Sequence, residues 1–230
     1  MFIVIGRKVI ASICYFCVLL VVVSGLYFTS QVSQAFIPSQ NFCVVLDAGH
    51  GGIDGGSQGK SGVYERDLNL KVTNKIEKLL NTMNIDVVQT RRTEEGLYGV
   101  FASGFKKRDM KARQKIIEDA KPDLVVSVHM NFYTNTSARG AQVFYKPNSE
   151  ISKKLANNMQ QLFVKNLIDT RKTSSEGDFF ILTCTQTPGV LVECGYLSNL
   201  QEEQLLISEK YQEILAYQIF CGIVSYFDLT

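Results

Sequence analysis

The chain has 230 residues, of which 46% are hydrophobic and 20% are charged, and this is an ordinary globular composition. The formal net charge of +2 is accounted for by Arg7 and Lys8 near the amino terminus, so the remainder carries no net charge. Because it also contains no block of lysine and arginine, we expect no nucleic-acid partner.

An uncharged, mostly apolar segment follows these two cations at residues 9–28. A positive flank before an apolar run is typical of a secretory signal, and twenty residues are also just long enough to span a bilayer. We therefore predict that residues 1–35 form a signal peptide or a membrane anchor, and both alternatives stay open. Residues 36–41 are predicted as a linker and residues 42–230 as one exported domain.

Strand-like and helix-like patterns alternate through this domain. Apolar strand patterns occur at 43–48, 86–90, 124–129, 141–146, 179–183 and 189–193. Helical patterns occur at 66–81, 107–120, 149–167 and 201–226. Their apolar stripes recur at helical spacing and are expected to face the core: Leu68, Val72, Ile76 and Leu79, then Ile151, Leu155, Met159 and Leu162. This alternation predicts an α/β fold with a single twisted, mainly parallel (mixed) sheet of about six strands and helices on both faces.

Four cysteines lie in the predicted domain, namely Cys43, Cys184, Cys194 and Cys221. They show no CxxC motif or other tight spacing. We expect them to be buried free thiols, with a disulfide as the less favoured alternative.

The chain has only two histidines, and both come at the end of an apolar run. His50 follows the run that starts at Val44, and His129 follows the run that starts at Leu124. Functional groups of open α/β sheets collect just beyond the carboxyl ends of the strands. We therefore expect both imidazoles at one edge of the sheet as metal ligands, although a single histidine in such a place is more often structural.

Two carboxylates complete this predicted group. Glu65 stands at the start of a predicted helix, where the helix dipole favours a negative charge. Glu193 ends another buried apolar run, where an ionised carboxylate without a partner would be costly. Two histidines and one carboxylate, with a fourth position left for water, are the composition of a catalytic zinc site. Glu193 would then act as general base and return the proton to a leaving amine.

Less specific roles remain for the acidic residues taken singly. Glu65 could be only a helix-start charge, and Glu193 could pair with Arg91 or Arg113. Asp47 could bind the metal or orient His50, and we expect the second role. A structural zinc site is disfavoured, because such sites are closed and rich in cysteine.

Three segments carry a resemblance to a known family: Leu46–Gly52, Ser127–Asn131 and Val192–Asn199. Together with Glu65 they resemble the zinc-dependent N-acetylmuramoyl-L-alanine amidases of the Amidase_3 type, over about residues 42–228. The resemblance implies that His50, Glu65 and His129 bind Zn²⁺ and that Glu193 is the catalytic carboxylate. It also implies hydrolysis of the amide between the lactyl group of N-acetylmuramic acid and the L-alanine of peptidoglycan stem peptides.

Within this family the chain is most similar to the compact germination-specific amidases of endospore formers, which prepare cortex peptidoglycan. That similarity implies a place on the outer face of the cytoplasmic membrane, in the wall or in the spore cortex. Because no wall-binding repeat is attached, we expect an accessory protein that positions the domain, and a membrane contact if the leader is uncleaved. A zinc peptidase of the stem peptide and a non-catalytic peptidoglycan-binding protein remain the alternatives.

Overall fold

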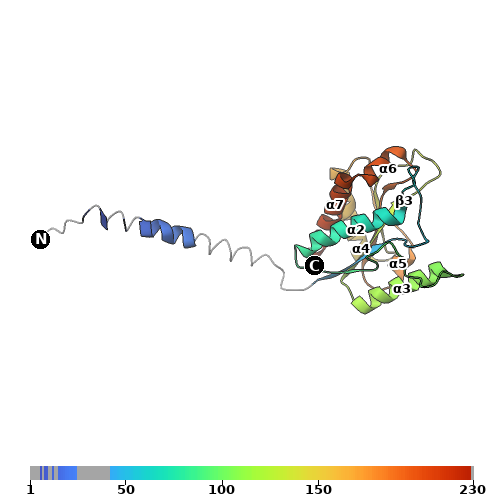
Figure 1. The fold of residues 1–230 in the computed structure, drawn as a ribbon, viewed down its shortest axis with the longest axis horizontal. Helices are drawn as coiled ribbons and strands as arrows, with labels where there is room; N and C mark the ends of the chain where they lie inside the picture. Colours follow the sequence, from blue (N-terminus) through green and yellow to red (C-terminus); the bar gives the residue numbers. More distant parts are fainter. Residues whose placement is uncertain (1–5, 7, 10–11, 13–14, 25–41, 229–230) are drawn as a thin grey trace. The chain divides into compact units, whose positions relative to one another are not determined.

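The computed structural model describes residues 6, 8–9, 12, 15–24 and 42–228 (Figure 1). The chain divides into two compact units, Met1–Asn41 and Phe42–Thr230. In the first unit, residues 15–24 are helical. No helix among the described residues is both long and apolar enough to cross a membrane. The predicted linker at 36–41 and most of the predicted leader at 1–35 lie outside the described residues.

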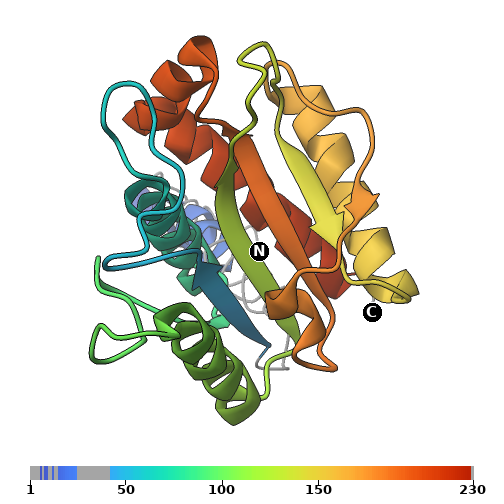
Figure 2. The same ribbon diagram turned by 90° about the vertical axis from the view of Figure 1, so that its right-hand side faces the viewer.

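The second unit is built on a six-stranded mixed sheet (Figure 2). Its order is β2-β1-β3-β6-β4-β5, and β2, β1, β3 and β6 run parallel. β4 is antiparallel to β6 and parallel to β5. The strands are β1 (Cys43–Ala48), β2 (Asp86–Gln89), β3 (Leu124–Asn131), β4 (Gln142–Tyr145), β5 (Ser175–Glu176) and β6 (Gly189–Tyr196). The predicted fold class is confirmed.

Helices cover both faces of this sheet (Figure 2). The larger core lies on one face, under α2 (Glu65–Asn81), α4 (Glu150–Asn166) and α7 (Glu209–Asp228). The smaller core lies on the other face, under α3 (Phe105–Ala120) and α5 (Phe180–Thr183). Successive side chains of a strand point to opposite faces, so Val44 and Leu46 join the first core and Val45 joins the second. Burial on both faces explains the continuous apolar runs in the sequence.

Two predicted elements are wrong. Segment 179–183 is the short helix α5 and not a strand, because the amides of Leu182 and Thr183 donate to the carbonyl of Phe179. Only Ile181 and Leu182 of this segment are buried, so one helical turn satisfies its apolar pattern as well as a strand would. The edge strand is β5, which is only two residues long and carries no apolar signal.

The predicted helix at 201–226 is in fact two helices, α6 (Leu200–Ile207) and α7. Ser208 between them has extended dihedral angles, which end α6. The Gln212 side chain donates to the carbonyl of Leu206 in the last turn of α6. The apolar stripe continues across this break, so periodicity alone does not reveal it.

The core-facing stripe of α4 is also rotated relative to the prediction. Leu155 and Met159 are buried, but Ile151 is 56% exposed and Phe163 takes the buried place expected for Leu162. The four cysteines of the domain are free thiols, and of these Cys194 is buried while the others are partly buried.

We expect Phe163→Ala to lower the free energy of unfolding by about 3–5 kcal/mol, because it removes a fully buried ring from the core between α4 and α7. Urea denaturation measures this change. Val164→Ala is the matched control, since Val164 is 49% exposed on the same helix and should change stability by less than about 0.5 kcal/mol. Equal effects of the two substitutions would contradict the assigned packing face.

Candidate metal centre

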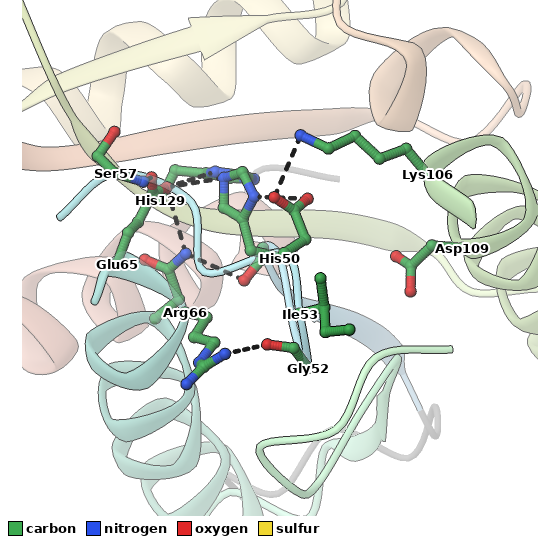
Figure 3. A network of polar contacts seen from close by, with 12 residues as sticks. His50, Gly52, Ile53, Ser57, Glu65, Arg66, Lys106, Asp109 and His129 are labelled. Atoms are coloured by element: carbon green, nitrogen blue, oxygen red, sulfur yellow. Dashed lines mark hydrogen bonds and ion pairs between the residues drawn. The ribbon is translucent and has the colours of Figure 1, made fainter. Parts of the chain in front are cut away.

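The two histidines meet at the carboxyl ends of β1 and β3, as predicted (Figure 3). His50 lies two residues beyond β1, and His129 lies within β3. Their ring centroids are 5.1 Å apart. Gly49 permits this approach, because a Cβ at that position would come within 2.1 Å of the His129 ring.

Glu65, the first residue of α2, lies between the two imidazoles. Its Oε1 is 3.2 Å from His50 Nε2 and 2.9 Å from His129 Nδ1. One ligand atom from each of the three residues lies within 4.8 Å of the others. Glu65 also accepts hydrogen bonds from the amides of Ser57 and Met130, so its carboxylate is fixed from both sides. A simple helix-start charge would not be buried in this way.

The carboxylates of Glu65 and Asp54 place negative charge beside the imidazoles, which favours a positive charge at this position. Burial alone would raise the pKa of Glu65, but hydrogen bonds from His129 and His50 outweigh it and hold that pKa well below its usual range. Burial opposes the charge of His50 too, yet Asp54 and Glu65 raise its pKa to about 9. Two imidazole nitrogens and a carboxylate oxygen are ligands that zinc prefers. The two distances from Glu65 Oε1, 3.2 and 2.9 Å, are close to the roughly 3.3 Å between ligands around a tetrahedral ion with bonds of about 2.0–2.1 Å. The residues present therefore fit a divalent metal.

Asp54 orients the His50 ring. Its Oδ2 lies 3.0 Å from Nδ1, which leaves Nε2 directed at Glu65. The hydrogen bond with His50 holds the pKa of Asp54 at about 2, against the opposing effect of burial. Oδ1 of the same carboxylate lies 3.2 Å from Nζ of Lys106. The role of Asp54 could not be predicted from the sequence, because the glycine-rich loop has no periodicity that would show where its side chains point.

Asp47 does not take the place predicted for it beside the imidazole. Its carboxylate is buried and accepts hydrogen bonds from Thr90, Ser127 and Arg113. Burial would raise its pKa, but the Arg113 charge and the two hydroxyl groups hold it at about 2. Asp47 therefore acts on the guanidinium group of Arg113 rather than on the His50 ring.

Arg113 and Arg91 hold the backbone around His50. Both donate to the carbonyl groups of Ala48 and His50, and Arg91 also donates to that of Gly49. His50 has a φ of 61°, which is uncommon for a residue with a side chain and needs support from its surroundings. These contacts supply that support. Among the described residues neither arginine forms an ion pair with Glu193, so that alternative pairing is wrong.

Glu193 on β6 lies beside His129, its register partner on β3, so both side chains leave the same face of the sheet. Its Oε2 is hidden from solvent and has no hydrogen-bond partner among the described residues. Burial raises the pKa of Glu193 to about 7, with Glu65 adding to the increase and His129 opposing it. A buried polar atom without a partner is costly, and it marks a position suited to a reactant.

A cavity of about 270 Å³ opens beside the two histidines. Its lining includes Asp47 and Leu191, residues of α3 and the segment around α5. Phe105, Phe179 and Phe180 make much of the wall apolar. The two histidines therefore border a cavity that has room for part of a substrate.

The domain is similar to known proteins over most of its length. Residues 44–225 match the Amidase_3 family model, described as N-acetylmuramoyl-L-alanine amidase. The chain is 32% identical over 195 residues to the germination-specific N-acetylmuramoyl-L-alanine amidase of Bacillus subtilis, covering 83% of this chain and 82% of the relative.

Solved structures are similar as well. The CwlD amidase of Clostridioides difficile, determined in complex with the GerS lipoprotein, has a TM-score of 0.78 and 33% identity, covering 83% of this chain and 100% of that one. The catalytic domain of CwlV, an N-acetylmuramoyl-L-alanine amidase from Bacillus (Paenibacillus) polymyxa var. colistinus, has a TM-score of 0.71 and 34% identity, covering 82% and 99%.

We expect Arg113→Met to lower the free energy of unfolding by about 3–5 kcal/mol at pH 8, because it leaves the buried carboxylate of Asp47 without its cation. The paired Asp47, with its lowered pKa, stabilises the native chain above pH 4, and this contribution is lost only as the pH falls through about 2. In the variant, burial raises the pKa of Asp47, so the loss in unfolding free energy should be smaller at pH 5 than at pH 8. Urea denaturation at both pH values measures this loss. A loss in unfolding free energy that is the same at both pH values would contradict the account.

We expect the affinity for a divalent metal to rise with pH between 6 and 8. The metal must displace the proton from His50, whose pKa is about 9, so affinity should increase up to about tenfold per pH unit. Calorimetric titration of the metal-depleted chain with Zn²⁺, in buffers of different ionisation enthalpy, counts the protons released. Binding that releases no proton and has the same affinity at both ends of the range would contradict the assigned ligand set.

Proposed function

The chain belongs to the N-acetylmuramoyl-L-alanine amidase family, acting on peptidoglycan, and we propose that His50, Glu65 and His129 hold a zinc ion for this reaction. The bond hydrolysed by such an amidase joins the lactyl carbonyl of N-acetylmuramic acid to the nitrogen of L-alanine. Zinc bound by the three residues would supply Lewis acidity, which polarises a carbonyl group and makes water a nucleophile near neutral pH.

Glu193 is proposed as the general base, and its unpartnered buried oxygen is the observation that supports this role most directly. A pKa of about 7 is close to the value at which a carboxylate both accepts and donates a proton at neutral pH. Glu193 takes a proton from the attacking water. It then gives that proton to the alanine nitrogen as the carbon–nitrogen bond breaks.

Asp54, Arg91 and Arg113 hold the side chain and backbone of His50 in place. Asp54 directs Nε2 of His50 toward the carboxylate of Glu65, and the two arginines fix the backbone from Ala48 to His50. Phe105, Phe179 and Phe180 give the cavity beside the two histidines an apolar wall. Each of these contacts is made before substrate arrives, so the geometry is preorganised.

The biological setting is proposed from the relatives. Similarity to the germination-specific amidase of B. subtilis supports a role in preparing spore cortex peptidoglycan. Peptidoglycan lies outside the cytoplasm, which supports export of residues 42–230 behind a signal peptide or membrane anchor at 1–35 and a linker at 36–41. The complex of CwlD with GerS supports an accessory protein as partner.

We expect Glu193→Gln to lower turnover about 10²–10⁴-fold, because the amide cannot transfer the proton. The assay follows newly exposed amino-terminal alanine released from peptidoglycan by the zinc-loaded chain. Zinc affinity should stay within about twofold, since Glu193 supports the reaction without binding the ion. Glu150→Gln is the control, because Glu150 is an exposed carboxylate on α4 and should leave turnover unchanged.

The position of the new end group separates the alternatives. An amino terminus within the stem peptide would support a zinc peptidase instead. Folded, zinc-loaded protein that releases no end group, even with membrane extracts added, would support a non-catalytic binding protein. Near-native turnover of Glu193→Gln would show that another group is the base.

A further inference from the structure

A positively charged side chain stands at the wall of the cavity beside the metal centre. Lys106 lies in the first turn of α3 and lines the cavity with Phe105 and Phe180. Figure 3 shows its amine reaching toward the His50 side of the centre. The side chain is 67% exposed, so its remaining N–H groups can reach a ligand in the cavity. A second cation on α3, Lys111, lies 5.7 Å from the centroid of the Phe180 ring.

The contacts of Lys106 limit how far its amine can lie from His50. Its Nζ lies 3.2 Å from Asp54 Oδ1, and Asp54 Oδ2 lies 3.0 Å from His50 Nδ1. The carboxylate oxygens, and likewise the two ring nitrogens, are about 2.2 Å apart, because the bonds between them are about 1.2–1.4 Å long. Added to the two contacts, these widths put the amine of Lys106 at most about 11 Å from His50 Nε2.

The substrate of an N-acetylmuramoyl-L-alanine amidase offers an anion within this limit. The second residue of the stem peptide is a glutamate joined through its side-chain carboxyl group, so its α-carboxyl group is free unless it is amidated. In an extended chain this carboxyl group lies about 7 Å from the scissile carbonyl carbon, because successive Cα atoms are about 3.8 Å apart. A further hydrogen bond of about 2.8 Å brings the cation within reach.

We propose that Lys106 is a specificity-determining residue that binds the free α-carboxylate of the second stem-peptide residue. The peptide half of the substrate then lies along α3, between Phe105 and Phe180. This contact favours substrate whose carboxylate is free over substrate whose carboxylate is amidated. The proposal rests on the proposed function for the position of the scissile amide.

The test uses the zinc-loaded full chain and two peptidoglycan fragments that differ only in whether this α-carboxyl group is free or amidated. The native chain should show a kcat/KM about three- to tenfold higher for the free acid. This ratio is what a charge-assisted hydrogen bond contributes when it is exposed (the lower value) or partly buried (the higher value). Lys106→Ala should abolish the preference, mainly through KM, and Lys106→Glu should reverse it. Lys107→Ala is the control, since Lys107 is exposed on the same helix and lies outside the described lining of the cavity.

A native chain without the preference, or Lys106→Ala that retains it, would overturn the proposal. Equal loss on both fragments would also overturn it, because Lys106 would then act only through Asp54 and His50. Zinc affinity of Lys106→Ala, expected within twofold of native, distinguishes that case independently. Hydrolysis of either fragment by the native chain keeps these outcomes separate from failure of the proposed function.

Discussion

The buried ion pair between Asp47 and Arg113 is the interaction on which the metal centre depends. Removing both charges from water is costly, and the structure offsets that cost with hydrogen bonds from Thr90 and Ser127 and with a second carboxylate, Asp109. The guanidinium group fixed in this way holds the carbonyl of His50, whose backbone adopts a left-handed conformation. A side chain with several rotatable bonds thus fixes the backbone of His50, which is proposed as a metal ligand.

Two carboxylates close to the same histidines have opposite protonation tendencies. Glu65 receives hydrogen bonds from both imidazoles and from backbone amides, which keep it ionised and suited to bind a cation. Glu193 lacks a partner for Oε2, and burial raises its pKa to about 7. Environments that separate the pKa values of neighbouring carboxyl groups assign them different chemical roles. Here the difference arises from which residue has access to hydrogen-bond donors.

The positions of three residues of the candidate metal centre could be predicted from the sequence, because each lies at the end of a buried strand. His50, His129 and Glu193 each follow an apolar run whose burial fixes its place in the sheet, and parallel strands deliver their ends to one edge. Glu65 was predictable from its place at a helix start. Asp54 and Lys106 were not, because their positions depend on how a loop and the start of α3 fold over that edge. For the same reason local patterns did not distinguish α5 from a strand or reveal the break at Ser208.

The central claim is that two imidazoles and one carboxylate bind the metal while Glu193 stays outside its ligand set. X-ray absorption at the zinc edge tests it most directly, on the zinc-loaded native chain and on Glu193→Gln. The account predicts four nitrogen or oxygen ligands at about 2.0–2.1 Å, two of them imidazoles, with the same spectrum for both proteins. A sulfur ligand at about 2.3 Å, or a ligand shell that changes in Glu193→Gln, would contradict it.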